Sequence, residues 1–222
     1  MLKSTRSAGH PLDSDGVWCQ IIRRPPPGRP ALFLDRDDTV IEDIGYLRQA
    51  DDVVLVPGAT EVIAAANRRG IPVIMVTNQS GVGRGYYGWP EFKSVQETTL
   101  ALLAAEGVKI DAVYACAHHP QAKGDFAHPD HPARKPNPGM LLQAAAALAL
   151  DLKSSWLIGD KADDIEAAKR AGIAGALLVG IGCADAERQR VAMLASPTFD
   201  VRLGRSIADA MTLPLLTSPH GT

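Results

Sequence analysis

Apolar and polar residues alternate in blocks along this chain, and the blocks predict strands and helices in turn. Short apolar runs typical of buried strands occupy five segments: 31–34, 71–76, 110–116, 155–158 and 174–179. Apolar residues at helical spacing lie in further segments: 59–69, 90–106, 140–150, 165–171, 185–194 and 206–211. Because strands and helices alternate, we predict an α/β fold with a doubly wound, parallel, Rossmann-like sheet.

The two ends of the chain do not follow this pattern. Residues 1–30 are mostly polar and end in a proline-rich run, which cannot join a helix or a central strand. We therefore expect an N-terminal extension and stiff connector, with Trp18 able to pack on the domain. Residues 31–212 should form a single domain, followed by a C-terminal tail over 213–222.

Two further segments are expected to lie near the strand ends. Residues 40–56 alternate apolar and polar positions around Gly45, which predicts a small β-hairpin flap. Residues 117–138 show no periodicity and hold four of the chain's six histidines. A loop of this length inside a domain usually has a function.

Composition narrows the classes of partner. The chain has 222 residues, of which 46% are hydrophobic and 22% charged, with a net charge of −2, as in ordinary globular domains. No basic surface suggests nucleic acid or an anionic membrane as a partner. The N-terminus lacks the apolar core of a signal peptide, residues 140–152 are too short to span a bilayer, and three distant cysteines argue against disulfides. We expect a cytoplasmic monomer that acts on a small molecule.

Candidate chemistry begins directly after the first predicted strand, at Asp35, Asp37 and Asp38. Carboxylates this close repel one another, and a bound cation or protonation of one group usually relieves the repulsion, so we expect a divalent metal ion. Asp35 and Asp37 lie two positions apart, so in an extended chain both side chains leave on the same face. One carboxylate could attack while the other moves protons. The alternative is a solvated acidic turn.

Other polar groups follow later strands. Thr77 comes directly after one apolar run, and Asp160 and Asp164 come after another. Lys135 opens the helix that follows Pro138, and a helix N-terminus favours anions. Ligands of open α/β sheets bind outside the carboxyl ends of the strands, so these groups should meet. Together they suit phosphoryl transfer.

Four polar clusters with this order and spacing resemble the motifs of the haloacid dehalogenase (HAD) superfamily of phosphohydrolases: 35–39, 77–78, 134–136 and 159–164. More closely, the five segments 33–39, 77–81, 116–120, 134–140 and 159–164 look like the family of D-glycero-D-manno-heptose-1,7-bisphosphate 7-phosphatases and their histidinol-phosphatase relatives. The resemblance covers residues 31–182. It implies a HAD sheet in which the flap and a short histidine-rich loop replace a large cap domain.

The resemblance also implies a mechanism. Asp35 would form an aspartyl-phosphate, and Asp37 would protonate the leaving group and then activate water. Thr77 and Lys135 would bind the transferring phosphoryl group. Mg²⁺ would be held by Asp35, the backbone carbonyl of Asp37, and Asp160.

The substrate implied is a phosphorylated sugar, heptose 1,7-bisphosphate, or alternatively histidinol phosphate or another small phosphomonoester. Asp164 would orient its neighbours. The positions that match substrate contacts in the family are Asp43, Gly45, Tyr46, Asn78, Gln79, Ser80, Arg134 and Lys161.

This chain departs from the family pattern in two places. Asp38 stands where the family has Gly, and the family's zinc ligands are only partly present. The resemblance implies Zn²⁺ bound by Cys116, His118 and His131, with His128 as a fourth ligand. The alternative is a loop that folds without zinc.

Two other classes of protein share parts of this pattern with the phosphatases. A response-regulator receiver also combines an acidic pair, Thr and Lys, but its phosphorylated Asp ends a middle strand, whereas residues 110–116 here end in no Asp. An inactive HAD protein is the other alternative, with Asp38 and the incomplete zinc motif as its signs.

Overall fold

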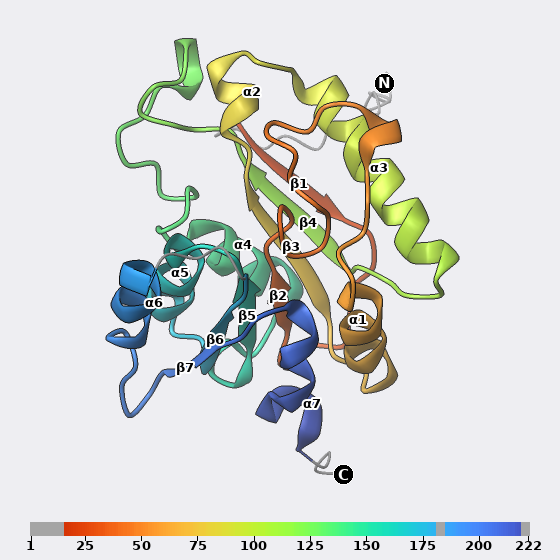
Figure 1. The fold of residues 1–222 in the computed structure, drawn as a ribbon, viewed down its shortest axis with the longest axis vertical. Coiled ribbons are helices and arrows are strands. Elements are labelled where there is room, and N and C mark those ends of the chain that lie inside the picture. Colours follow the sequence, from red (N-terminus) through yellow and green to blue (C-terminus); the bar gives the residue numbers. More distant parts are fainter. Residues whose placement is uncertain (1–15, 181–184, 219–222) are drawn as a thin grey trace, which may run out of the picture.

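The computed structural model describes residues 16–180 and 185–218, which form a seven-stranded sheet with helices on both faces (Figure 1). The strand order is β1-β4-β3-β2-β5-β6-β7, and every pairing is parallel except that of β1 with β4. The strands are β1 (Val17–Ile21), β2 (Leu32–Leu34), β3 (Val73–Asn78), β4 (Ala112–Cys116), β5 (Trp156–Gly159), β6 (Gly175–Leu178) and β7 (Asp200–Leu203). The predicted doubly wound parallel sheet is confirmed.

Strand β2 lies at the centre, and its three residues are fully buried. Leu32 pairs with Val73 on one side and with Trp156 on the other. Successive side chains point to opposite faces, so Leu32 and Leu34 belong to one core cluster while Phe33 belongs to the other. This burial on both faces explains why the parallel strands are continuous apolar runs in the sequence.

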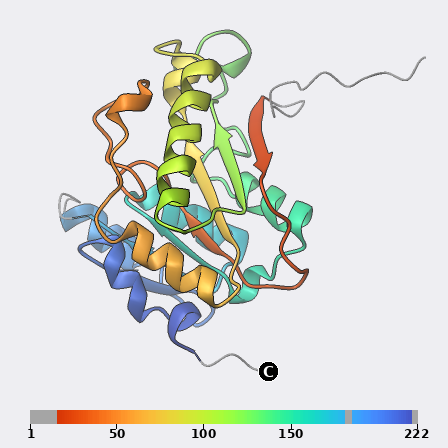
Figure 2. The ribbon, with the colours of Figure 1, turned by 90° about the vertical axis from the view of Figure 1, so that its right-hand side faces the viewer.

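The helices divide between the two faces of the sheet (Figures 1 and 2). One core cluster is covered by α1 (Ala59–Arg68), α3 (Trp89–Ala105), the 3-10 segment Ile207–Thr212 and α7 (Pro214–Thr217). The other is covered by α4 (Gly139–Leu148), α5 (Ala162–Ala171) and α6 (Asp185–Ala192). No helix in the described part of the chain is long and apolar enough to cross a membrane.

Strand β1 was not predicted, although the packing of Trp18 was. Its residues pair antiparallel with β4, Val17 opposite Cys116, and Trp18 stacks on Trp89 with ring centroids 5.7 Å apart. Arg23 fastens the end of this segment to buried Asp111 through a 2.8 Å ion pair. A strand of five residues beside a proline-rich run carries little local signal, because its pairing partner lies far away in the sequence.

The flap over residues 40–56 is a hairpin only at its base. Ile41 bridges to Leu55 in antiparallel fashion, and the amide of Val56 donates to the carbonyl of Val40 at 2.9 Å. Beyond that point the chain bends at Gly45 and Tyr46, both with positive φ, and no strand forms. The described residues hold no large cap domain, as the sequence predicted.

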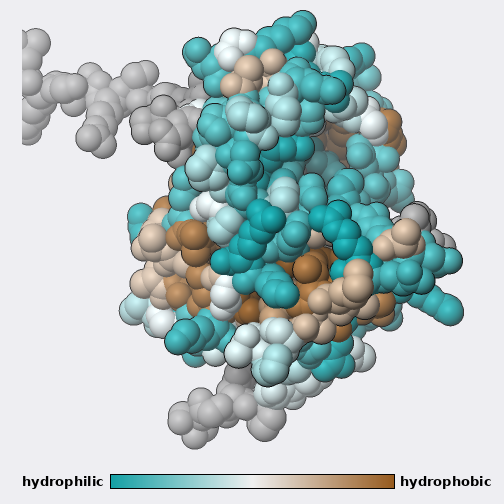
Figure 3. Space-filling model, turned by 90° about the vertical axis from the view of Figure 1, so that its left-hand side faces the viewer, coloured by the Kyte–Doolittle hydropathy of each residue, from teal (hydrophilic) through white to brown (hydrophobic). Residues whose placement is uncertain are grey.

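The end of the domain also differs from the prediction. Residues 214–217, expected in the C-terminal tail, form helix α7; Leu216 within it and Leu213 before it are buried. The helix predicted over 206–211 is a 3-10 segment. Figure 3 shows the left-hand side of the molecule, where most surface residues of the upper half are hydrophilic and the larger hydrophobic area lies lower down.

Candidate active site

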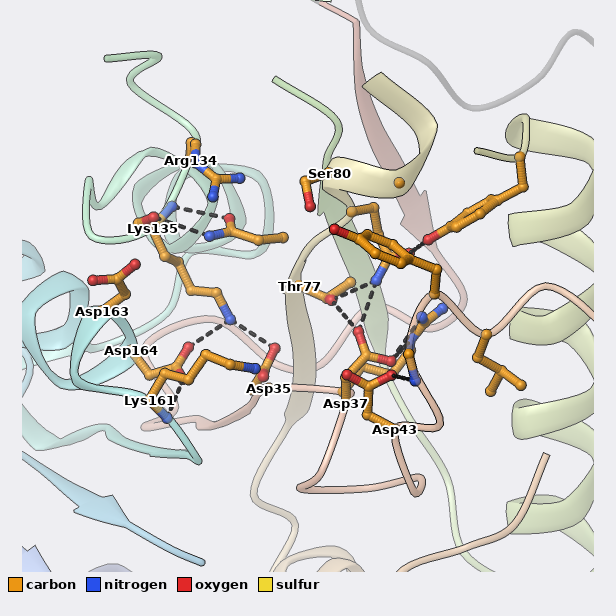
Figure 4. A pocket seen from close by; sticks show the side chains of 18 residues that line it. Asp35, Asp37, Asp43, Thr77, Ser80, Arg134, Lys135, Lys161, Asp163 and Asp164 are labelled. Atoms are coloured by element: carbon orange, nitrogen blue, oxygen red, sulfur yellow. Dashed lines mark hydrogen bonds and ion pairs between the residues drawn. The ribbon is translucent and has the colours of Figure 1, made fainter. Parts of the chain in front are cut away.

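A cavity of about 380 Å³ lies where the carboxyl ends of the central strands meet (Figure 4). Asp35 follows β2, Thr77 lies near the end of β3, and Lys161 lies after β5. The cavity lining brings together twelve of the predicted site residues: Asp35, Asp37, Asp43, Gly45, Tyr46, Thr77, Asn78, Gln79, Ser80, Arg134, Lys135 and Lys161. In open α/β sheets such a crevice forms outside the carboxyl ends of the strands, at the point where the strand order reverses.

Lys135 forms the electrostatic centre of this cavity. Its Nζ lies 2.7 Å from Asp35 Oδ1 and 2.5 Å from Asp164 Oδ1, and all three side chains are buried. Burial opposes ionisation of Asp35, but the nearby Lys135 ammonium and its hydrogen bond hold the pKa of this carboxyl below its ordinary value. Burial by itself would lower the pKa of Lys135, but the negative charges of Asp164 and Asp35 raise it above its ordinary value. The Lys135 ammonium therefore favours the ionised form of the buried Asp35 carboxyl.

Asn78 holds the Lys135 backbone in place. Its Nδ2 donates to the Lys135 carbonyl at 2.9 Å, and its Oδ1 accepts from the Lys135 amide at 3.0 Å. The Lys135 ammonium also donates to the carbonyl of Val76 at 2.8 Å. We predicted a substrate contact for Asn78, whereas here both polar ends of its side chain are used by the loop that carries Lys135.

Three carboxylates form a group that could hold a cation. Ligand atoms of Asp35, Asp160 and Asp164 all lie within 4.8 Å of one another. Asp160 Oδ1 is buried and makes no hydrogen bond within the described structure. Burial, together with the charges of Asp35 and Asp164, raises the pKa of Asp160 to about 8. Such an excess of negative charge on hard oxygen ligands suits Mg²⁺.

Asp164 lies within this group, whereas from the sequence we predicted only that it would orient its neighbours. It lies in the first turn of α5, and its Oδ2 accepts from the amide of Lys161 at 3.1 Å. Its side chain passes so close to Gly159 that a Cβ there would lie 2.4 Å from it. Burial raises the pKa of Asp164 to about 6. Its spacing of four residues from Asp160 was the signal available in the sequence.

Asp37 faces away from Lys135 and accepts hydrogen bonds from several side chains. Arg36 donates to Oδ1 from both Nε and Nη2, at 3.0 and 2.8 Å. Oδ2 accepts from Gln79 Nε2 at 2.9 Å and from Thr77 Oγ1 at 3.3 Å. Arg36 is only 1% exposed and lies over the ring of Phe92. Arg36 was not predicted as a site residue, and in the sequence only its place between two aspartates pointed to it.

Asp38 makes its hydrogen bond within the flap and does not belong to the group of three carboxylates. It has a left-handed backbone (φ 55°), and its Oδ1 accepts from the amide of Asp43 at 2.9 Å. Asp43 Oδ1 accepts in turn from the amide of Gly45 at 2.8 Å. The next residue, Tyr46, receives a 2.8 Å hydrogen bond from Arg84 Nη1 on its hydroxyl. Asp tolerates the left-handed conformation, which explains how it replaces Gly here.

The histidine-rich loop gathers the four residues predicted as zinc ligands. The rings of His118 and His131 stack with centroids 3.6 Å apart, and Cys116 Sγ lies 3.9 Å from His131 Nδ1. The ring of His128 lies 5.1 Å from that of His131. Among residues 16–180 and 185–218, however, only the aspartate group brings three ligand atoms within 4.8 Å of one another.

Comparison with known proteins agrees with this geometry. A family model described as HAD-hydrolase-like matches residues 132–201. A D-glycero-beta-D-manno-heptose-1,7-bisphosphate 7-phosphatase of Mesorhizobium japonicum is 53% identical over 172 residues, which cover 77% of this chain and 79% of that protein.

Two solved structures resemble this fold closely. A protein from Mesorhizobium loti described as a HAD-like phosphatase is 47% identical, with a TM-score of 0.83 over 94% of this chain and 95% of that one. The D,D-heptose 1,7-bisphosphate phosphatase of B. bronchiseptica, complexed with magnesium and phosphate, is 29% identical, with a TM-score of 0.67 over 81% of this chain and 94% of that one.

Proposed function

Because this chain belongs to the D-glycero-D-manno-heptose-1,7-bisphosphate 7-phosphatase family of HAD-like hydrolases, we propose that it removes the 7-phosphate from heptose 1,7-bisphosphate through an aspartyl-phosphate. The chain is a phosphoric monoester hydrolase, so the receiver and inactive-protein alternatives are set aside. The observation that carries the proposal is the buried Lys135 ammonium, which keeps Asp35 ionised beside Thr77 in one cavity.

In the first step, Asp35 attacks phosphorus. One oxygen of its carboxylate accepts from Lys135 at 2.7 Å, so the other oxygen forms the new bond to phosphorus. The bond from phosphorus to the sugar oxygen breaks, and Asp37 donates a proton to that leaving oxygen. Thr77 and Lys135 donate to the phosphoryl oxygens as charge redistributes over them.

In the second step, Asp37, now a carboxylate, takes a proton from a water molecule. The water oxygen attacks phosphorus, the bond between phosphorus and Asp35 breaks, and inorganic phosphate is released. This returns Asp35 to its carboxylate form and Asp37 to its protonated form, so the two residues complete a cycle without a further proton source.

Asp35, Asp160 and Asp164 would hold Mg²⁺, with the backbone carbonyl of Asp37 as the further ligand that the resemblance implies. When bound, the ion neutralises the negative charge that the carboxylates and the phosphoryl group bring together. The unpaired Oδ1 of Asp160 supports this assignment, because a buried carboxylate oxygen without a partner is costly.

The substrate part of the proposal is supported by the remaining charges of the cavity. A bisphosphate carries a second anion, and Arg134 and Lys161 line the same cavity as Asp35. The flap residues Asp43 and Tyr46 line its other side and offer hydrogen bonds to sugar hydroxyls. Ser80 also lines the cavity.

Phosphate release from three compounds tests the substrate. With Mg²⁺ present, we expect kcat/KM for heptose 1,7-bisphosphate to exceed that for histidinol phosphate and for glucose 6-phosphate by about 100-fold or more. A preference for histidinol phosphate would replace the proposed substrate with the alternative, while leaving the phosphatase chemistry intact.

Magnesium should stabilise the protein more at high pH. Since the pKa of Asp160 is raised, this carboxyl favours the folded state when protonated, and its contribution is lost as pH rises from about 4 to about 8. Magnesium competes with that proton, so it should raise the melting temperature more at about pH 9 than at about pH 6. Thermal melts with and without Mg²⁺ measure the difference. In Asp160→Asn we expect a much smaller magnesium effect at both pH values, and an unchanged effect would contradict the assignment.

Zinc in the histidine-rich loop is a further proposal, and the gathering of Cys116, His118, His128 and His131 supports it. We expect about one Zn²⁺ per chain by elemental analysis of the purified protein, and a loss of this zinc in His118→Ala. A zinc content near zero in the wild type would contradict this proposal.

A cytoplasmic location and a monomeric state stay predictions from the sequence, to be checked by cell fractionation and size-exclusion chromatography.

A further inference from the structure

Tyr87 is a cavity residue to which the sequence analysis gave no role. It lies between α2 (Ser80–Arg84) and α3, and its hydroxyl donates to Gln79 Oε1 at 2.6 Å. Gln79 is 2% exposed, and its Nε2 donates to two acceptors, Asp37 Oδ2 and Thr77 Oγ1, both at 2.9 Å. A chain of hydrogen bonds therefore joins the Tyr87 hydroxyl to Asp37.

The direction of the Gln79 amide decides whether this chain can exist. Its two ends differ chemically, since the oxygen only accepts hydrogen bonds and the nitrogen only donates them. If the amide turned over, its oxygen would face the Asp37 carboxylate, and neither group could donate. The Asp37 carboxylate, which can only accept, favours the amide nitrogen on its side, and the Tyr87 hydroxyl adds a hydrogen bond that holds the amide oxygen at the other end.

The protein fixes the Tyr87 ring by close packing. A Cβ on Gly81 would lie 2.3 Å from Tyr87 Cε1, so only glycine lets the ring approach the backbone this closely. Burial raises the pKa of Tyr87 to about 12. The hydroxyl thus keeps its proton, and can donate it in a hydrogen bond, at neutral pH.

We propose that Tyr87 is a positioning residue for proton transfer, which acts through the Gln79 amide to hold Asp37 and Thr77 in place. The inference rests on the proposed function, because it gives Asp37 the role of acid and base. Asp37 needs a set position in both steps. The same Gln79 amide also donates to Thr77 Oγ1, which itself donates to Asp37 Oδ2 at 3.3 Å, so the three side chains hold one another.

The test compares Tyr87→Phe with the wild type on two substrates. Hydrolysis of heptose 1,7-bisphosphate releases an alkoxide that needs a proton, and we expect kcat to fall about 10-fold, less than a complete loss of acid–base catalysis. 4-Nitrophenyl phosphate releases a phenolate that needs none, so the rate of its first turnover should stay within about twofold of the wild type. Its steady-state turnover should fall, because Asp37 must still activate water.

A general structural effect would give a different result. The inference would be overturned if Tyr87→Phe slowed the first turnover of 4-nitrophenyl phosphate as much as it lowers kcat for heptose 1,7-bisphosphate. An unchanged kcat on both substrates would also overturn it. If the wild type does not act on heptose 1,7-bisphosphate, the proposed substrate fails, but the comparison of first and later turnovers of 4-nitrophenyl phosphate still tests Tyr87. Tyr114→Phe is the matched control, since Tyr114 is buried on β4 and does not line the cavity.

A double-mutant cycle tests whether Tyr87 acts through Gln79. Gln79→Met removes the amide while keeping a side chain of similar length, and it should lower kcat at least as much as Tyr87→Phe. On the Gln79→Met background, adding Tyr87→Phe should change kcat by less than about twofold. A further loss of about 10-fold would show that the two residues act independently and would contradict the inference.

Discussion

Asp35→Asn is expected to lower phosphate release by about 10⁴-fold or more, because the amide cannot form the aspartyl-phosphate. Asn has nearly the shape of Asp, so the cavity should persist. The variant also removes one of the two carboxylates bound by Lys135. Initial rates with 4-nitrophenyl phosphate and with heptose 1,7-bisphosphate, both with Mg²⁺, measure the loss.

The control for this variant is Asp151→Asn. Asp151 lies outside the cavity, and its Oδ1 accepts from the Lys153 amide, a contact that Asn can keep. We expect wild-type rates in this control. Activity of Asp35→Asn within about 10-fold of the wild type would mean that another residue is the nucleophile.

Lys135→Met is expected to weaken both stability and catalysis. The Lys135 side chain is buried between two carboxylates, and its removal leaves Asp35 and Asp164 close together without a counter-charge. Breaking a buried pair in this way costs about 3–5 kcal/mol in the free energy of unfolding. Loss of a donor to the phosphoryl oxygens should lower kcat by about 10²–10³-fold. Denaturant unfolding and initial rates measure the two effects separately.

The pH dependence of Lys135→Met gives a further check. Without the ammonium, the pKa of Asp35 should rise, since Lys135 is what holds it down against burial. A carboxyl with a raised pKa favours the folded state at low pH, so the stability difference from wild type should shrink on going from about pH 7 to about pH 5. Lys93→Met removes an exposed lysine paired with Glu97 and should cost about 0.5 kcal/mol or less. Equal losses in the two variants would contradict the role given to Lys135.

Much of the fold could be predicted because its signals are local. The buried strands β2, β3 and β5 are mostly apolar runs; Asp35 and Asp160 directly follow β2 and β5, and Thr77 lies near the end of β3. The order of strands then brings Asp35 and Thr77 together without further information. These parts follow from periodicity and from the general geometry of parallel sheets.

The parts that were missed depend on contacts between distant segments. Strand β1 exists because Val17–Ile21 finds the edge of β4, and no pattern within those five residues indicates this partner. The hydrogen bonds of two side-chain amides depend on distant segments in the same way: that of Asn78 holds the backbone of Lys135, and that of Gln79 joins Tyr87 to Asp37. Both residues line the cavity, and their predicted contacts with substrate stay predictions. Which way a side-chain amide points depends on its neighbours in space, and the sequence does not show them.

The most direct test of the mechanism is to trap the phosphorylated enzyme. Asp37→Asn should still form the intermediate from 4-nitrophenyl phosphate, but it should hydrolyse it slowly, because no base activates water. Rapid acid quenching followed by peptide mass spectrometry should find one phosphoryl group, on Asp35. A phosphoryl group on any other residue, or turnover with no phosphorylated peptide at any quench time, would contradict the account.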